Sequence, residues 1–276
     1  MARIALVAGA SSGLGRAVAE RLAADGFVTY AGARSFAAGA QVPEGCVPLA
    51  LDVTDEVSVT AAVSAVLAKE GRIDVLVHCA AFLTLGACEE ASIDEQRRVL
   101  ETNYLGVVRM VQAVLPVMRA QGAGRIALFS SLNGLMAIPF QGAYVASKHA
   151  IEGFAEALRL EVRRFGVSVT VVNPGDCRGG SSAYRGHADV AEQPDSPYRP
   201  YYKAATEKIY QDESGGLAPG RVAAAVSRAL TKRHAPLRVV VAKMEQRLAM
   251  WLHDLLPGRL FVRIIETYYA PKEKTI

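Results

Sequence analysis

The sequence predicts an α/β protein in which helices flank both faces of a doubly wound parallel sheet. Several short segments are apolar throughout, which is typical of strands buried on both faces of a parallel sheet. Helical patterns separate these segments, and this alternation produces right-handed crossovers between parallel strands. A glycine-rich turn at residues 9–15 follows the first apolar segment and leads into the first helix.

The strand and helix patterns alternate along most of the chain. Strands are expected at Ile4–Ala8, 27–31, 47–51, 73–79, 125–129, 167–172 and 237–242. Helices are expected at 16–24, 57–69, 92–119 (a pair), 144–165, Pro219–Thr231, 244–256 and 260–269. Gly26 and Gly71 follow the first two helices, and Ser92 with Glu95 forms a capping box at the start of the third.

Residues 179–216 interrupt this alternation. The segment is rich in Gly, Ser, Pro and Tyr, and five of the ten tyrosines of the chain lie in it: Tyr184, Tyr198, Tyr201, Tyr202 and Tyr210. A long irregular segment in a compact domain is usually either a functional lid or disordered. Since it follows a strand on the side where open α/β sheets bind ligands, we predict a substrate lid.

Residues 244–276 are expected to form a C-terminal helical extension. Its apolar residues at helical spacing form a stripe of Met244, Leu248, Trp251, Leu252 and Leu255. Such a stripe more often packs in a core or against a subunit than on a lipid surface. Contact with a membrane surface stays open as an alternative, but no segment approaches the about 20 apolar residues that a spanning helix needs.

Length and composition favour one soluble domain over residues 1–276, with a sizeable core. The chain is 51% hydrophobic and 21% charged, and its formal net charge of +4 is scattered, without the basic block typical of nucleic-acid binding. The N-terminal residues predict a first strand, not a signal peptide. The cysteines lack metal-ligand or Cys-x-x-Cys spacing, so we expect reduced thiols, a cytoplasmic location and no metal site: Cys46, Cys79, Cys88 and Cys177.

Tyr144 and Lys148 carry the strongest chemical signal. They are four residues apart and therefore share one face of the helix expected at 144–165. A phenol titrates near pH ~10 and is by itself a poor acid or base in a cell. A neighbouring ammonium favours the phenolate, so Lys148 is expected to lower the pKa of Tyr144. The pair predicts a tyrosine general acid/base, with a solvated helix face as the alternative.

The glycine-rich turn predicts a dinucleotide site. Glycines let the backbone approach a pyrophosphate, and the N-terminus of the following helix offers unpaired N–H groups. The candidate residues of this turn are Gly9, Ser11, Ser12, Gly13, Leu14 and Gly15. Arg34 follows the second strand, at the place where an acidic residue would bind the ribose and select NAD. Because an arginine can instead bond a 2′-phosphate, NADP(H) is favoured over NAD(H). Asp52 and Val53 are placed to meet the adenine, or Asp52 caps a helix.

Together these features resemble the short-chain dehydrogenase/reductase family, over residues 2–178 and in order. The resemblance is strongest to its branch of hydroxysteroid and retinol dehydrogenases. It implies a single Rossmann-type domain and a homodimer or homotetramer. It also implies a catalytic set of Asn103, Ser131, Tyr144 and Lys148. Lys148 would hold the nicotinamide ribose, Ser131 would bond the substrate oxygen, and Asn103 would position a water. Pro174 and Gly175 would lie beside the nicotinamide.

Two positions depart from the family pattern. The asparagine-rich motif after the fourth strand is replaced by His78-Cys79-Ala80-Ala81, so that Cys79, Ala80 and Ala81 would approach the cofactor through their backbone. His78 is more often a satisfied interior histidine than a replacement for the lost asparagine. The threonine expected after Gly175 is absent, and Gly179 occupies its place.

The predicted reaction is hydride transfer between NADP(H) and a lipophilic ketone or secondary alcohol, such as a steroid, retinoid or long-chain keto compound. The substrate would contact Ser131, Leu135, Tyr144 and Tyr184. A 3-oxoacyl-thioester reductase is an alternative, with Arg178, Arg185 and Arg199 as the basic patch for a carrier. A non-catalytic NADP-binding sensor or scaffold is an alternative of a different kind.

Overall fold

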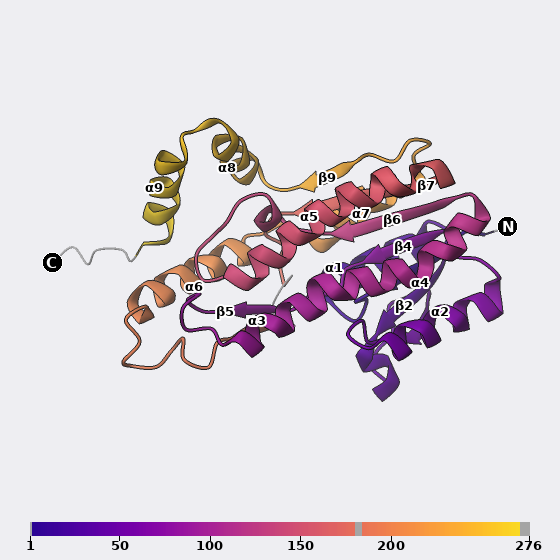
Figure 1. Ribbon diagram of the computed structural model, residues 1–276, viewed down its shortest axis with the longest axis horizontal. Helices are drawn as coiled ribbons and strands as arrows, with labels where there is room; N and C mark the ends of the chain where they lie inside the picture. The colour runs from indigo at the N-terminus through magenta and orange to yellow at the C-terminus, as the bar shows by residue number, and fades with distance from the viewer. Residues whose placement is uncertain (1, 180–183, 271–276) are drawn as a thin grey trace.

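The computed structural model describes residues 2–179 and 184–270. Its centre is a seven-stranded parallel sheet in the order β3-β2-β1-β4-β6-β7-β9 (Figure 1). The strands of this sheet are β1 Ile4–Ala8, β2 Val28–Ala33, β3 Cys46–Ala50, β4 Val75–His78, β6 Gly124–Phe129, β7 Val167–Pro174 and β9 Arg238–Val241. A small parallel pair joins β5 Leu83–Leu85 to β8 Arg185–His187. The predicted sheet is confirmed.

Helices cover both faces of the sheet. On one face lie α1 Gly13–Ala24 and α7 Pro219–Thr231, and on the other lie α2 Glu56–Glu70, α4 Gly106–Gln121 and α5 Gly142–Val162. Along β1 the side chains alternate between the two apolar clusters, so each face of the strand is buried. This double burial explains why β1 is apolar throughout.

The order of the strands reverses at β1, and a crevice lies at the carboxyl ends of the strands there. β1 is bonded to β2 on one side and to β4 on the other, so the crossovers on the two sides run in opposite directions. The loops after these strands separate and leave a crevice between them, which is the usual ligand site of an open α/β sheet. The glycine-rich turn follows β1 and the segment after His78 follows β4, so both lie beside this crevice.

The helix pair expected at 92–119 contains α3 Ile93–Leu100, a π-helical turn at Glu101–Leu105 and α4. Ser92 and Glu95 make the predicted capping box, with bonds in both directions. Short 3-10 turns occupy Arg34–Ala38, Leu132–Gly134 and Arg163–Phe165. The π-helical turn contains Asn103, and such turns are frequent at functional sites.

The segment 179–216 is more regular than its composition indicated. Residues 180–183 lie outside the described part of the chain, β8 follows them, and Arg199–Ser214 forms helix α6. Four residues of α6 at helical spacing are buried: Tyr202, Ala205, Thr206 and Ile209. The expectation of an irregular segment was wrong because the Gly, Pro and Tyr content hid this spacing of buried residues.

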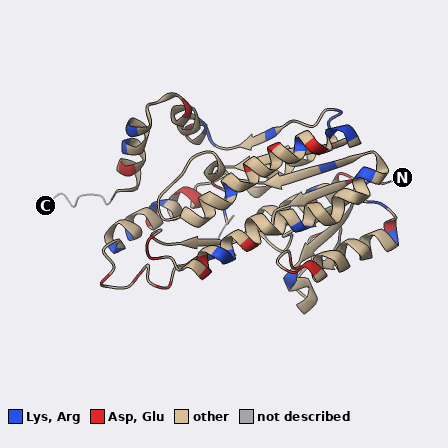
Figure 2. Cartoon of the chain, in the orientation of Figure 1, with Lys and Arg blue, Asp and Glu red and all other residues tan. Residues whose placement is uncertain are grey.

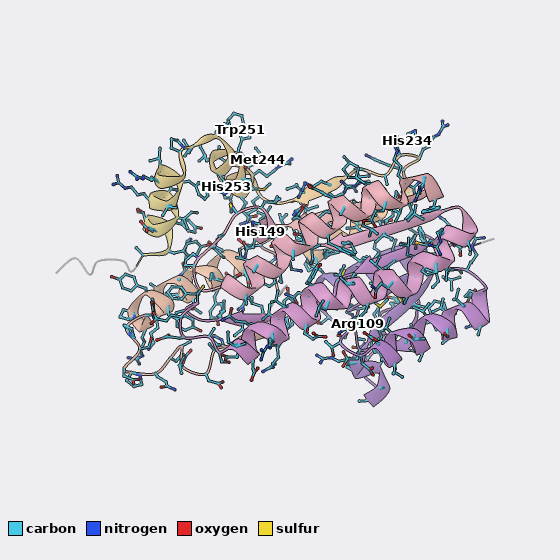
Figure 3. All side chains as sticks on the ribbon, viewed as in Figure 1. Arg109, His149, His234, Met244, Trp251 and His253 are labelled. Carbon is cyan, nitrogen blue, oxygen red and sulfur yellow. The ribbon has the colours of Figure 1, made fainter. Side chains whose placement is uncertain are left out.

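The last two helices, α8 Met244–Leu255 and α9 Gly258–Tyr269, extend from the sheet domain at the upper left of Figure 1. α8 buries no residue, and α9 buries Phe261. Met244 is 77% exposed and Trp251 is 64% exposed, and Figure 3 shows both on the outer side of α8. Among the described residues, no helix has the length and apolarity to cross a membrane. Acidic and basic residues are interspersed over the elements in Figure 2.

Candidate active site

One cavity of about 710 Å³ runs from the glycine-rich turn to α9. Most of the predicted site residues line it: Gly9, Ser11, Ser12, Leu14, Gly15, Arg34, Asp52, Val53, Cys79, Ala80, Ala81, Ser131, Tyr144, Lys148, Pro174, Gly175 and Tyr184. Three predicted residues are not among its lining: Gly13, Asn103 and Leu135. The chain thus brings residues from distant parts of the sequence around a single space.

The glycine-rich turn packs too closely against its neighbours for larger residues. A Cβ atom added to Gly9 would lie 2.4 Å from the backbone nitrogen of Ala80, and one added to Gly15 would lie 2.0 Å from the carbonyl oxygen of Gly9. Gly9 also has a φ of 82°, which favours glycine. Helix α1 begins here, with Ser12 as its N-cap residue. This backbone cradle at a helix N-terminus fits a pyrophosphate.

The ends of β2 and β3 form the adjoining wall. Arg34 is exposed at the start of the turn that follows β2 and lines the cavity. Asp52 accepts bonds from the backbone N–H and the hydroxyl of Thr54, at 2.9 and 2.7 Å. The N-cap of α2 is Asp55, which accepts from the N–H of Val57. The capping alternative for Asp52 was therefore wrong, and its side chain instead shapes the cavity wall.

The segment that replaces the family asparagines lies between the turn and α4. His78 is 2% exposed, and burial together with the charge of Lys148 lowers its pKa to about 3, so the ring is neutral. Its ring bonds the backbone near Gly106, and its Nε2 has no partner among the described residues. Cys79 lines the cavity, and burial raises its pKa, so the thiol stays protonated. His78 is an interior histidine that does not reach the cavity.

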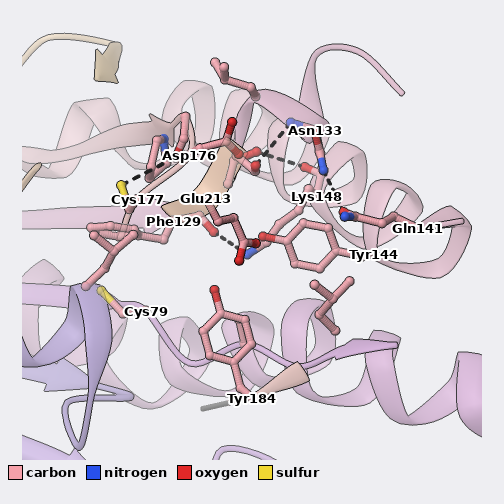
Figure 4. Close-up of a pocket in the computed structure, with 18 of the residues that line it drawn as sticks. Cys79, Phe129, Asn133, Gln141, Tyr144, Lys148, Asp176, Cys177, Tyr184 and Glu213 are labelled. Carbon is pink, nitrogen blue, oxygen red and sulfur yellow. Dashed lines mark hydrogen bonds between the residues drawn. The ribbon is translucent and has the colours of Figure 1, made fainter. Parts of the chain in front are cut away.

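Tyr144, Lys148 and Ser131 all line the cavity, and Figure 4 shows Tyr144 and Lys148 side by side. Both Tyr144 and Lys148 lie in the first turns of α5, and the Lys148 Nζ is 5.4 Å from the centroid of the Tyr144 ring. The Lys148 Nζ donates to the carbonyl oxygen of Phe129 at 2.8 Å, which fixes the ammonium. The hydroxyl group of Ser131 lies close enough to that of Tyr144 to act on its pKa. A substrate oxygen can therefore meet two hydroxyl groups at once.

The pKa of Tyr144 is shifted opposite to the expected direction. Burial raises it to about 12, the Ser131 hydroxyl acts against this shift, and the charge of Glu213 adds to it. Burial lowers the pKa of Lys148 to about 8. The expectation of a lowered pKa for Tyr144 was wrong, because desolvation is the largest contribution and Lys148 is not among the groups that shift this pKa. A neutral phenol is the form that can donate a proton.

Asn103 is fully buried behind the cavity. Its Nδ2 donates to the carbonyl oxygen of Phe82 and to the Ser147 hydroxyl, both at 2.9 Å, and its Oδ1 accepts from the N–H of Phe82 at 2.7 Å. Ser147 in turn donates to the carbonyl oxygen of Tyr144 at 2.7 Å. The side chain of Asn103 thus ties the segment before β5 to the first turn of α5. Its role in positioning a water stays a prediction.

The turn after β7 closes the cavity beside Tyr144. Asn173 is fully buried, donates to the carbonyl oxygen of Ser131 at 2.8 Å and to the carboxylate of Glu152 at 2.6 Å, and accepts from Arg238 at 2.9 Å. These bonds hold the start of the Pro174-Gly175 turn against the loop that carries Ser131. Pro174 and Gly175 line the cavity on this side.

The apolar part of the cavity differs from the prediction at one residue. Leu135 does not line it, because the 3-10 turn at Leu132–Gly134 directs Met136 inward instead, and Met136 is buried. Tyr184 lines the cavity as predicted. Phe140 has a φ of 61°, which strains a residue that is not glycine, and its ring packs edge-to-face on Tyr202 at 5.5 Å.

A set of cavity residues from the C-terminal third was not predicted from the sequence. These residues lie on α6, α8 or α9, or in the turn after β7: Asp176, Ile209, Asp212, Glu213, Glu245, Gln246, Ile264, Ile265, Tyr268 and Tyr269. Asp176 could have been found, since it directly follows Gly175. The residues of α9 could not, because nothing in their local pattern indicates that the helix folds back over a cavity.

The fold, the glycine cradle and the Tyr144–Lys148 pair together define a nicotinamide-dependent oxidoreductase of the α/β class. Residues 3–188 match the sequence profile of the short chain dehydrogenase family, and the chain belongs to that family.

Two curated proteins show how the similarity is distributed along the chain. The chain is 35% identical to a 3-ketodihydrosphingosine reductase from Bacteroides thetaiotaomicron, over 97% of this chain and 98% of that protein. It is 41% identical to human 17-beta-hydroxysteroid dehydrogenase type 1, over 63% of this chain and 57% of that protein. A solved short-chain dehydrogenase from Streptomyces avermitilis superposes with a TM-score of 0.78 at 32% identity, covering 98% of this chain and 96% of that one.

Proposed function

We propose that this protein uses NADP(H) to transfer a hydride between the nicotinamide and the carbonyl carbon of a lipophilic ketone. The observation that carries the proposal is a single cavity that joins the glycine cradle, the Tyr144–Lys148 pair and an apolar wall. The wall is built largely by Leu83, Met136, Ile138, Ile209, Ile264 and Ile265. The carbonyl group of such a ketone would lie at the polar side chain of Tyr144, and the rest of the ketone would lie against the apolar wall.

The cofactor preference rests on Arg34. Two solved structures similar to this chain contain NADP or a derivative of it, and another structure of the same fold contains NAD. Arg34 lines the cavity at the end of β2, where its guanidinium can bond a 2′-phosphate, and the adjoining Ala33 and Ser35 carry no charge that would oppose one. We therefore favour NADP(H) over NAD(H).

The protein groups would act on the substrate oxygen. A bound nicotinamide would supply or accept the hydride. In reduction, the neutral hydroxyl of Tyr144 donates its proton to the oxygen that gains charge, while Ser131 donates a second hydrogen bond to the same oxygen. The buried ammonium of Lys148 stabilises the phenolate left on Tyr144 and is fixed for a contact with the ribose. Since the raised pKa keeps Tyr144 protonated, the site is suited to reduction.

The extent of the similarity favours a long-chain ketone within the lipophilic class. The similarity to the 3-ketodihydrosphingosine reductase extends over 97% of this chain, including α6, α8 and α9, whereas the similarity to the steroid dehydrogenase covers 63%. The carrier-thioester alternative receives less support, because Arg185 of its basic patch is paired with Glu213 inside the protein. The sensor alternative requires loss of Tyr144 or Lys148, and both line the cavity. Homo-oligomerisation and a cytoplasmic location stay predictions.

Steady-state oxidation of NADPH and NADH tests this function. The purified protein is assayed with a long-chain 3-ketone, a steroid ketone, retinal and a 3-oxoacyl thioester, and Tyr144→Phe serves as the control. We expect NADPH-dependent turnover of the long-chain ketone, with kcat about 100- to 10,000-fold lower in Tyr144→Phe. Arg34→Ala should reduce the NADPH-over-NADH preference at least about tenfold. Tight NADPH binding without turnover of any carbonyl would contradict the proposal and favour the sensor.

A further inference from the structure

Asp176 differs from the other three carboxylates at the end of the cavity formed by α6 and α8. These three each pair with a cation: Asp212 with Lys208 at 2.9 Å, Glu245 with Lys243 at 3.6 Å, and Glu213 with Arg185. Asp176 instead accepts a hydrogen bond from the neutral amide of Gln246. Within residues 2–179 and 184–270, no ion pair joins Asp176 to a lysine or arginine. Among these four carboxylates, the negative charge of Asp176 is therefore the one without an ion pair in the described part of the chain.

This negative charge lies close to the reacting group. Glu213 acts electrostatically on Asp176 on one side, and on Tyr144 and Tyr184 on the other. Figure 4 shows the side chain of Glu213 pointing toward the hydroxyl groups of Tyr144 and Tyr184. Asp176, in the turn after β7, faces the same space. A substrate whose carbonyl oxygen is bonded by Tyr144 would thus extend its neighbouring carbon toward these two carboxylates.

A neutral ketone would leave the charge of Asp176 unmatched in a partly buried position, which is unfavourable. A phosphate-bearing thioester would be repelled. A protonated amine would supply the missing ion pair, and its three N–H donors can bond more than one carboxylate oxygen. An amine on the carbon next to the carbonyl would be held beside the carbonyl oxygen, and hence on the side of the cavity where Glu213 points toward Tyr144.

We propose that Glu213 and Asp176 determine specificity by binding the protonated amine of a long-chain 2-amino ketone. The inference rests on the proposed function and narrows its substrate class. Glu213 contacts the amine next to Tyr144, and Asp176 supplies a carboxylate that forms no ion pair with a lysine or arginine of the described residues. The apolar wall from α6 and α9 holds the alkyl chain.

The test compares two ketones of equal chain length, one with a 2-amino group and one without it. The readout is the ratio of their kcat/KM values with NADPH. We expect the wild-type protein to favour the amino ketone at least about tenfold, and Asp176→Asn or Glu213→Gln to reduce that ratio by about 10- to 100-fold. Asp254→Asn, at an exposed position of α8 outside the cavity, should leave the ratio unchanged. A wild-type ratio near one, or a ratio that neither cavity variant changes, would overturn the inference.

A binding measurement separates this inference from the proposed function. The long-chain 2-amino alcohol is titrated calorimetrically into the wild-type protein and the two variants, each saturated with NADP⁺, with the amine-free alcohol as reference. Tighter binding of the amino alcohol by the wild-type protein alone would support amine recognition even if neither ketone is reduced. Equal binding of the two alcohols by the wild-type protein would refute amine recognition even if both ketones are reduced.

Discussion

The two halves of the cavity are built by different means. The cofactor half consists of loops that follow β1 to β4, and its closest contacts, such as Gly9 against Ala80, join backbone to backbone. The substrate half consists of side chains on α6, α8 and α9, packed on a small apolar cluster or, for α8, without any buried residue. In the cofactor half, the close backbone contacts allow only glycine at a few positions and leave most other positions free to vary. In the substrate half, a loosely packed helix tolerates many different side chains. Substitutions in the two halves should therefore affect different properties.

Gly15→Ala should break the cofactor half. The new Cβ would lie 2.0 Å from the carbonyl oxygen of Gly9 and 3.1 Å from the Cβ of Cys79, and neither of these atoms is the end of a flexible side chain. We expect the free energy of unfolding to fall by about 3 kcal/mol and NADPH affinity to fall by about 100-fold or more. Denaturant unfolding and fluorescence titration with NADPH measure the two effects.

Gly153→Ala is the matched control for that substitution. Gly153 lies in α5, is exposed, and has no atom within 4 Å of an added Cβ. The same chemical change should raise the free energy of unfolding by up to about 1 kcal/mol, because alanine is the better helix former. Equal effects of the two substitutions would show that close backbone contact is not what restricts the turn.

The charge of Lys148, at the boundary between the halves, should make stability depend on pH. Burial lowers its pKa from 10.5 to about 8, so between these values the unfolded chain binds more protons than the folded protein, and stability rises with pH. Lys148→Met removes this group. Between pH 7 and pH 10, the wild-type protein should therefore gain about 2 to 3 kcal/mol in unfolding free energy relative to the variant.

Denaturant unfolding of both proteins at several pH values measures this difference. The raised pKa of Tyr144 is common to both proteins and acts above pH 10, so it contributes little to the comparison within this range. A difference that does not change with pH would mean that Lys148 keeps its ordinary pKa in the folded state.

The cofactor half was predictable from sequence because its rules are local. Three local patterns locate the site at one edge of a parallel sheet. They are the strands that are apolar throughout, the glycine turn before a helix, and the four-residue spacing between Tyr144 and Lys148. The direction of the pKa shift of Tyr144 was not predictable. It depends mainly on the burial that distant segments impose, and the charge of Glu213 on α6 adds to it.

The substrate half was less predictable because its contacts are long-range. Glu213 gave no signal, since α6 itself was hidden by its Pro and Tyr residues and by the Gly and Pro residues that flank it. Leu135 and Met136 are neighbours of equal character, and only the geometry of the 3-10 turn selects Met136 for the cavity. Ile264 and Tyr268 reach the cavity through a fold-back of α9 that the apolar spacing of the helix does not encode.

Ile264→Ala should give the smallest effect and the sharpest contrast with Gly15→Ala. Ile264 lines the cavity, and it is 42% exposed, so removing its outer carbons deletes only part of the apolar contact with an alkyl chain. We expect KM for a long-chain ketone to rise by less than about tenfold, with the NADPH affinity and the free energy of unfolding unchanged. A short-chain ketone that does not reach α9 should show no change in KM.

Val262→Ala is the control on the same helix. Val262 is 52% exposed and is not among the cavity-lining residues, so its truncation removes apolar surface from α9 without touching the substrate. An equal rise in KM for both variants would mean that α9 acts on the substrate through its overall position and not through Ile264. A rise confined to Ile264→Ala would place chain-length selection in the side chains of a helix whose only buried residue is Phe261, and this selection could then change without disturbing the cofactor half.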